Sequence, residues 1–169
     1  MTRSWEEIQD IGAMACAQLF ESYGVPLARE SGRVTLQSRM RYCGIIHFRG
    51  EKIHGTIGLA TPQDILGQSD PARVGARDWV GELANQLAGR LKNRLLARSV
   101  EVSYSTPVIL RGEQLSLESN GPVETVWFRS KMGSQVGFWI DLDLADRFQM
   151  SEETDEEKAG LPEGDFLLF

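Results

Sequence analysis

The stretch DWVGELANQLAGRLKNRLLARSVEVSYSTP, residues 78–107, predicts one long amphipathic helix followed by a strand. At about 100° per residue, its apolar side chains gather on roughly half of the helical circumference. We therefore expect this helix to pack one face against a hydrophobic core. The residues of that face are Trp79, Val80, Leu83, Ala84, Leu87, Leu91 and Leu95.

The opposite face of the same helix is predicted to be exposed, and it carries Asp78, Glu82, Asn85, Gly89 and Lys92. Glu82 and Asn85 are three residues apart, so their side chains rise side by side from neighbouring turns. A glycine inside a helix costs about 1 kcal/mol relative to alanine. On the exposed face, Gly89 would leave a shallow notch that another surface could approach. An acid and an amide beside such a notch could position a water molecule, bind a cation of a partner, or simply be solvated.

The length and composition indicate one globular domain followed by a charged tail. A chain of 169 residues with 41% hydrophobic and 25% charged residues can bury a core of useful size. Residues 151–169 hold seven acidic residues and one lysine, which equals the whole net charge of −6, so residues 1–150 are neutral overall. We expect a domain at 1–150 and a flexible acidic tail at 151–169, with docking of the apolar end as the rival interpretation. The absence of a basic stripe argues against nucleic acid as a partner.

The sequence shows no targeting segment and no metal-binding pattern. The first residues lack the apolar run of a signal peptide, and no run of about 18 apolar residues occurs, so we expect a cytoplasmic protein outside the membrane. Cys16 and Cys43 form no Cys-x-x-Cys pattern and are expected to be reduced, packed thiols. His47 and His54 show no spacing to the cysteines that matches a metal site and are interpreted as isolated, structural histidines, so we assign no metal to them.

The rest of the pattern predicts a first helix and a set of short strands. Ser4 can cap a helix over residues 4–23, with Glu7 three residues on as in a capping box. Short connections between strands imply antiparallel pairing with the helices collected on one face, which is an α+β fold. The order of a helix followed by three strands occurs twice, which suggests a duplicated architecture. Strands are expected at 33–37, 42–48, 53–60, 100–105, 108–110, 115–118, 123–129 and 135–142, and single helical turns at 61–66 and 144–150.

The segment GELANQLAG, residues 81–89, with Asp78 before it and Pro107 after it, resembles the signature of the CheC/CheX/FliY chemotaxis phosphatases. That signature consists of an acidic or small polar residue, then Glu-x-x-Asn, then a distant proline. The segment GIIHFRGEKIHGTIGLATP, residues 44–62, is similar to the strand pair that precedes this helix in the family. The resemblance covers about residues 40–142. Because the first helix lacks a second Glu-x-x-Asn, the chain resembles single-site CheX more than two-site CheC or FliY.

The resemblance implies a phosphatase that hydrolyses the aspartyl phosphate of a CheY-like response-regulator receiver domain. Asn85 would orient the attacking water, a task that suits an amide because its oxygen accepts and its nitrogen donates without titrating near neutrality. Glu82 would pair with a lysine of the receiver. Asp78 would contact the receiver or favour the start of the helix, where its charge suits the helix dipole. Mg²⁺ would belong to the receiver, so no cofactor of the chain's own is expected, and CheX-like members imply a homodimer formed through the sheets.

The sequence also leads to expectations for Leu96 and Pro107 and to one alternative function. Leu96 falls on the polar face of the long helix and is expected either as an isolated exposed leucine or as a contact with the partner. Pro107 is expected to interrupt the following strand at an edge or bulge. The rival function is a non-catalytic CheX-like module that binds receiver domains or motor components, which would depend on Leu96 rather than on Asn85.

Overall fold

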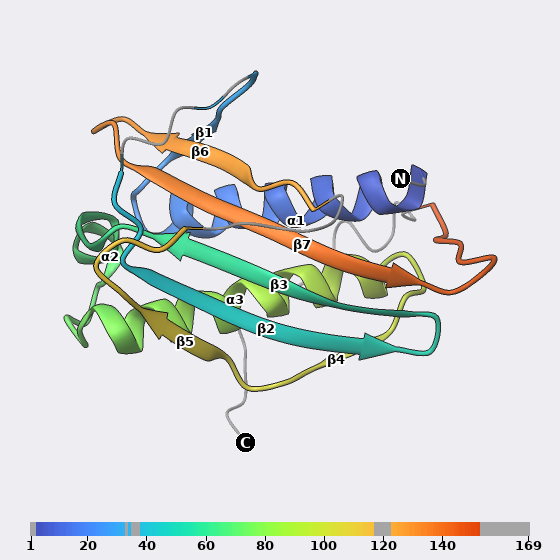
Figure 1. The fold of residues 1–169 in the computed structure, drawn as a ribbon. Coiled ribbons are helices and arrows are strands. Elements are labelled where there is room, and N and C mark those ends of the chain that lie inside the picture. The colour runs from blue at the N-terminus through green and yellow to red at the C-terminus, as the bar shows by residue number, and fades with distance from the viewer. Residues whose placement is uncertain (1–2, 33, 35–37, 117–122, 153–169) are drawn as a thin grey trace.

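The computed structural model describes residues 3–32, 34, 38–116 and 123–152. Within these ranges, three helices and seven strands share one sheet-and-helix arrangement (Figure 1). The helices are α1 (Arg3–Ser22), α2 (Gln63–Ser69) and α3 (Ala76–Leu96). The strands are β1 (Leu27–Arg29), β2 (Tyr42–Gly50), β3 (Ile53–Thr61), β4 (Val102–Tyr104), β5 (Val108–Arg111), β6 (Val126–Ser130) and β7 (Gln135–Leu144).

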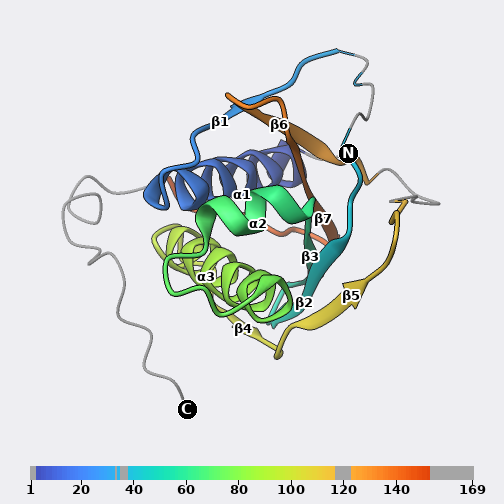
Figure 2. The same cartoon turned by 90° about the vertical axis from the view of Figure 1, so that its left-hand side faces the viewer.

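The sheet has the strand order β1-β6-β7-β3-β2-β4, and β5 also pairs with β2. Every strand pair is antiparallel. All three helices lie on one side of this sheet, as the end view shows (Figure 2). The predicted α+β architecture, with helices on one face of a mainly antiparallel sheet, is therefore confirmed.

The strand order is symmetric with respect to the two halves of the chain. The first half contributes α1 and the strands β1, β2 and β3, and the second contributes α3 and the strands β4 to β7. Exchanging β1, β2 and β3 with β5, β6 and β7 turns the strand order β1-β6-β7-β3-β2-β5 into β5-β2-β3-β7-β6-β1. This is the original order counted from the opposite edge of the sheet. The two halves therefore interlock about the central β3–β7 pair, and each edge strand pairs with a strand of the other half.

The core lies between the helices and the sheet face that they cover. On β7, the alternate residues Val136, Phe138 and Ile140 are completely buried, because alternate side chains of a strand point to the same face. Helix α1 lies directly on this strand, since a Cβ atom added at Gly12 would come within 2.5 Å of the Phe138 ring. The apolar face predicted for the long helix is likewise buried along α3.

Pro107 lies in the break between β4 and β5, where a proline can sit without removing a ladder hydrogen bond. Both strands pair with β2, but Phe48 faces Tyr104 whereas Ile45 faces Val108. Two residues of β2 therefore oppose three residues around the proline, which is the geometry of a bulge. The expected role of Pro107 as a strand interruption is confirmed.

Most predicted elements are present within a few residues of their expected ends, and three differences have physical reasons. The three-residue strand β1 was not predicted, because Leu27–Arg29 is too short to show a period-two pattern. The helical turn expected at 61–66 is the longer helix α2. The helical turn expected at 144–150 is wrong: Leu144 still belongs to β7, and a single hydrogen-bonded turn follows it, from Phe148 N–H to the Ala145 carbonyl oxygen.

Some predictions concern residues that the structure does not describe. Residues 33 and 35–37 of one expected strand, residues 117–118 of another, and the tail at 153–169 lie outside the described ranges. The boundary expected at residue 150 therefore stays a prediction. None of the helices in the described part of the chain combines the length and apolar character needed to cross a membrane.

Candidate functional site

Helix α3 is held very close to the sheet at one point. A Cβ atom added at Gly44 of β2 would lie 2.8 Å from the Ala84 Cβ and 3.3 Å from the Val80 carbonyl oxygen. Only a residue without a side chain allows this approach. The contact fixes the helix on its apolar side and leaves the opposite side of its first half free to carry functional groups.

The structure places the predicted site residues of the first half of α3 together on that free side. Asp78, Glu82 and Asn85 are all exposed. Asp78 and Glu82 are four residues apart, and Glu82 and Asn85 are three apart, so the three side chains occupy neighbouring turns. The site thus offers a carboxylate and an amide side by side, with a second carboxylate one turn away.

Gly89 does not lie on an exposed notch as predicted, because the residue is buried. Helical side chains lean toward the N-terminus of their helix. Side chains three and four residues further on, at Lys92 and Asn93, therefore lean over a position that has no side chain of its own. The helical wheel gives the direction of a position but not how far its neighbours extend, which is why the prediction of an exposed notch at Gly89 was wrong. A role of Gly89 in partner binding stays a prediction.

Leu96 is 50% exposed, as its place on the polar face suggested. It lies eleven residues after Asn85, which corresponds to about 16 Å along the helix axis. Leu96 therefore shares the face of the site but not its immediate surroundings. Its role as a partner contact stays a prediction.

Sequence reasoning missed Gln86, which contacts the site, and Tyr23, which contacts Gln86. Gln86 donates a hydrogen bond from Nε2 to Glu82 Oε1 at 2.7 Å. Its other amide atom, Oε1, accepts from the Tyr23 hydroxyl at 2.8 Å. The first contact has a sequence signal, because an acid and an amide four residues apart on a helix often pair. The second joins residues from two helices and has none.

In the described part of the chain, no group of three or more His, Cys, Asp or Glu residues could hold a metal ion. His54 Nε2 lies 3.1 Å from Asp143 Oδ2 on the neighbouring strand. Cys16 and Cys43 are free and buried, as predicted. Burial raises the pKa of both thiols, that of Cys43 to about 12, so neither is a reactive thiolate near neutrality.

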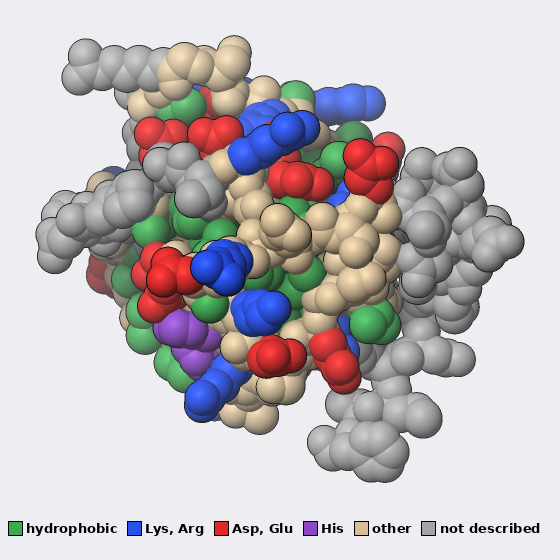
Figure 3. Space-filling view, turned by 90° about the vertical axis from the view of Figure 1, so that its right-hand side faces the viewer, with side chains coloured by type: hydrophobic (Ala, Val, Ile, Leu, Met, Phe, Trp, Pro, Cys, Tyr) green, Lys and Arg blue, Asp and Glu red, His purple; other side chains and the backbone are tan. Residues whose placement is uncertain are grey.

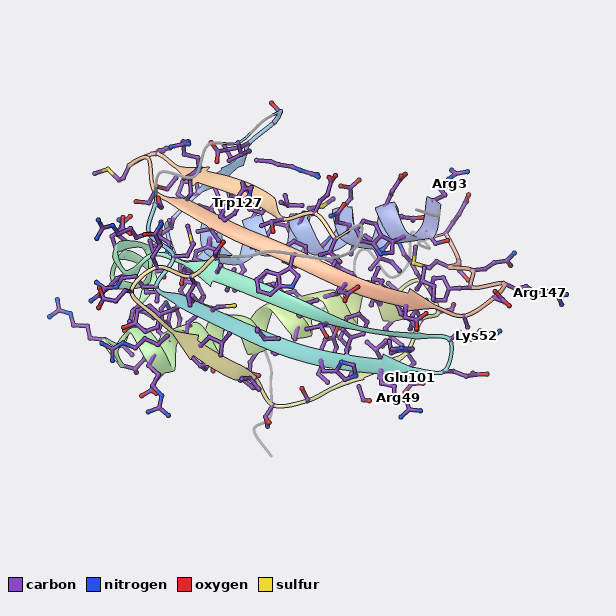
Figure 4. The ribbon with its side chains drawn as sticks, in the orientation of Figure 1. Arg3, Arg49, Lys52, Glu101, Trp127 and Arg147 are labelled. Carbon is purple, nitrogen blue, oxygen red and sulfur yellow. The ribbon has the colours of Figure 1, made fainter. Side chains whose placement is uncertain are left out.

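A cleft of about 610 Å³ lies toward the other end of α3, between the β2–β3 turn and the segment that joins α3 to β4. Figure 4 shows Arg49, Lys52 and Glu101, which line it, at the same end of the molecule. Basic and acidic side chains are interspersed on that end (Figure 3). Neither Glu82 nor Asn85 lines this cleft. Small-molecule sites are usually concave, so the exposed Glu82 and Asn85 are better suited to a macromolecular surface.

Comparisons with known proteins agree on one family and one fold. The family model described as chemotaxis phosphatase CheX matches residues 42–130, a range that contains Glu82 and Asn85. No curated protein matches the sequence.

Similar solved structures include chemotaxis proteins from several bacteria. The chemotaxis protein CheX from Vibrio vulnificus has a TM-score of 0.68 at 18% identity, over 81% of this chain and 97% of that one. The chemotaxis protein CheX from Desulfovibrio desulfuricans has a TM-score of 0.64 at 18% identity, over 81% and 99%. The CheX–CheY–BeF3–Mg²⁺ complex from Borrelia burgdorferi has a TM-score of 0.59 at 17% identity, over 79% and 96%. At these identities the likeness shows a shared fold.

Proposed function

The chain belongs to the CheX family of chemotaxis phosphatases, and from this membership we propose that it hydrolyses the aspartyl phosphate of a CheY-like receiver domain. One observation carries the proposal. Glu82 and Asn85 are exposed on neighbouring turns of a helix that is fixed against the sheet, inside the range matched by the family model. The CheX in the Borrelia burgdorferi complex is bound to CheY, which supports a receiver domain as the partner class.

Hydrolysis of an aspartyl phosphate requires the phosphatase mainly to position the reacting groups. In an aspartyl phosphate the phosphoryl group is carried by a carboxylate, which is a good leaving group. A water molecule attacks the phosphorus in line, the bond from phosphorus to the aspartate oxygen breaks, and the products are inorganic phosphate and a free aspartate. Placing that water is the main task of the catalyst.

Asn85 is suited to hold this water. Its amide oxygen accepts a hydrogen bond from the water, and its amide nitrogen donates to an oxygen of the phosphoryl group. Because an amide does not titrate near neutrality, this role persists across the physiological pH range. The phosphatase supplies no metal in this scheme, and Mg²⁺ stays with the receiver.

Glu82 and Asp78 are suited to binding rather than to proton transfer. The exposed Glu82 carboxylate pairs with a lysine of the receiver next to the phosphoryl group. Asp78 lies one turn earlier and contacts the receiver surface or favours the start of α3. We also propose a cytoplasmic location, and a homodimer formed through the sheets, which the family resemblance implies.

The decisive experiment measures phosphate loss from purified phosphorylated receivers of the source organism. The wild-type protein is expected to shorten the phosphate lifetime of its cognate receiver. Asn85→Ala is expected to lower the rate constant by about 100-fold or more, since a small misplacement of reacting groups already costs that much. Asn93→Ala is the matched control, because it removes the same side chain from the same helix two turns further on. An unchanged phosphate lifetime with every receiver of the organism would refute the proposal.

A non-catalytic binding module is the second candidate, and the exposure of Leu96 favours it. A large apolar side chain that is 50% exposed on the face of the site gains free energy when a protein partner covers it and removes it from water. In that case Leu96→Asp would weaken binding of the receiver by about tenfold or more, whereas the phosphate lifetime would be the same with and without the protein.

A further inference from the structure

The hydrogen bonds of Gln86 form a directional chain that ends at Glu82. An ionised carboxylate only accepts hydrogen bonds, so an amide that pairs with Glu82 must turn its nitrogen toward it. The amide oxygen of Gln86 then needs a donor on its other side. The Tyr23 hydroxyl supplies that donor at 2.8 Å, and Gln86 Nε2 reaches Glu82 Oε1 at 2.7 Å. Each donor thus faces an acceptor along the chain from Tyr23 through Gln86 to Glu82.

Tyr23 is itself fixed on both sides. It directly follows α1, and its backbone N–H donates to the Phe20 carbonyl oxygen. Its ring meets that of Trp79 edge to face, with centroids 4.9 Å apart and an interplanar angle of 88°. The Trp79 indole nitrogen in turn donates to the buried Ser69 Oγ at 2.8 Å. The hydroxyl that orients Gln86 is therefore held by groups from α1, α2 and α3.

The contact lies where α1 and α3 run side by side (Figure 2). The partners of successive α3 residues move back along α1: Gln86 contacts Tyr23, Arg90 contacts Ser22, and Arg94 contacts Gln18. The two helices are thus antiparallel, and the end of α1 reaches the middle of α3. Of these three contacts, only that of Tyr23 continues to the residues of the proposed site.

We infer that Gln86, oriented by Tyr23, is a positioning residue that holds the Glu82 carboxylate in one orientation for the receiver. This inference rests on the proposed function, because it assigns a receiver as the partner of Glu82. A free glutamate side chain on a helix samples several rotamers, and selecting one of them costs affinity. The pair Tyr23–Gln86 removes that cost before the receiver arrives.

The experiment measures binding of a receiver activated with beryllofluoride and Mg²⁺, so that affinity is read without hydrolysis. Tyr23→Phe and Gln86→Ala are each expected to raise the Kd by about three- to tenfold. In hydrolysis assays the same variants are expected to raise KM and to change kcat by less than about twofold. Ser22→Ala is the matched control, because it removes a neighbouring α1–α3 contact, Arg90 Nη2 to Ser22 Oγ at 3.4 Å, that does not reach Glu82.

A double-mutant cycle separates positioning from simple bracing of the two helices. In a Glu82→Ala background, Gln86→Ala is expected to have no further effect on the Kd, because its effect passes through the carboxylate. Additive effects, or an equal loss with Ser22→Ala, would overturn the inference. If a receiver binds but its phosphate lifetime does not change, the phosphatase function is refuted and the positioning inference is not. In that case the double-mutant cycle still measures, through the Kd, whether Gln86 acts through Glu82. Failure of every receiver to bind would overturn both.

Discussion

Gly44 and Ala84 lie at a close approach between the long helix and the sheet, since a Cβ at Gly44 would lie 2.8 Å from that of Ala84. Real Cβ atoms essentially never come so close, and the nearby Val80 carbonyl oxygen belongs to the backbone of the helix. The position of α3, and therefore that of Glu82 and Asn85, depends on the lack of a side chain at Gly44 in the sheet beneath the helix.

Gly44→Ala is expected to lower the free energy of unfolding by about 1–3 kcal/mol, because the added methyl group pushes α3 away from β2. Urea denaturation measures this change. Gly67→Ala is the matched control: Gly67 lies in helix α2, and a Cβ there would meet nothing within 4 Å. That substitution is expected to stabilise the protein by about 0.5–1 kcal/mol through helix propensity. A Gly44→Ala variant as stable as the wild type would show that α3 is free to shift.

Glu82→Gln tests whether charge matters at the site. The substitution keeps the size of the side chain and an acceptor for Gln86, but it removes the negative charge that is proposed to pair with a cation of the receiver. Receiver binding is expected to weaken by about fivefold or more at low salt, and the difference from the wild type is expected to shrink as the salt concentration rises. Glu101→Gln, an exposed acid at the cleft, is the control. A difference from the wild type that does not change with salt would argue against a charge pair.

Glu30 makes stability depend on pH. Burial alone would raise its pKa, but hydrogen bonds from Gln135 and Arg129 and the charge of Arg129 outweigh it, so the pKa lies below its usual range. A carboxyl group with a lowered pKa in the folded state contributes stability above its unfolded pKa and loses it as the pH falls through the folded pKa.

We therefore expect Glu30→Gln to destabilise the protein by about 1–3 kcal/mol near pH 7 and by much less at a pH below the lowered pKa of Glu30 in the folded state. Denaturation curves at both pH values measure this. If the variant is destabilised equally at the two pH values, the charge of the Arg129–Glu30 pair, whose atoms lie 2.6 Å apart, does not contribute to the free energy of unfolding.

Tyr104→Phe and Tyr23→Phe are expected to change stability in opposite directions. The Tyr104 hydroxyl is buried and has no hydrogen-bond partner within the described structure. Its removal relieves the cost of an unsatisfied polar group and is expected to raise the free energy of unfolding by about 1 kcal/mol. Tyr23→Phe loses the bond to Gln86 and is expected to lower it by about 1 kcal/mol. Thermal unfolding of the two variants measures both changes, and a destabilised Tyr104→Phe would reveal a partner for that hydroxyl.

The sequence predicts those parts of the site that depend on one helix. The period of the apolar residues in 78–96 gives the direction of Glu82 and Asn85, and the structure leaves both exposed. The period does not predict what other elements bring near. Tyr23 and Gln86 are 63 residues apart in sequence, and they meet only because α1 and α3 pack side by side. The error at Gly89 has a different origin, because its burial depends on how far neighbouring side chains of the same helix extend.

Each of the two interlocked halves of the sheet carries one long helix, α1 or α3, and the two helices differ in the residues that they carry. Symmetry of strand order places α1 and α3 in equivalent positions, yet only α3 carries Glu-x-x-Asn. The helix without the motif ends at Ser22, directly before Tyr23, whose hydroxyl is linked to Glu82 through Gln86. The duplicated scaffold thus carries the proposed site on one helix and the groups that orient Gln86 beside the other. If the proposed roles hold, substitutions at Tyr23 change the site without changing a residue that contacts the receiver.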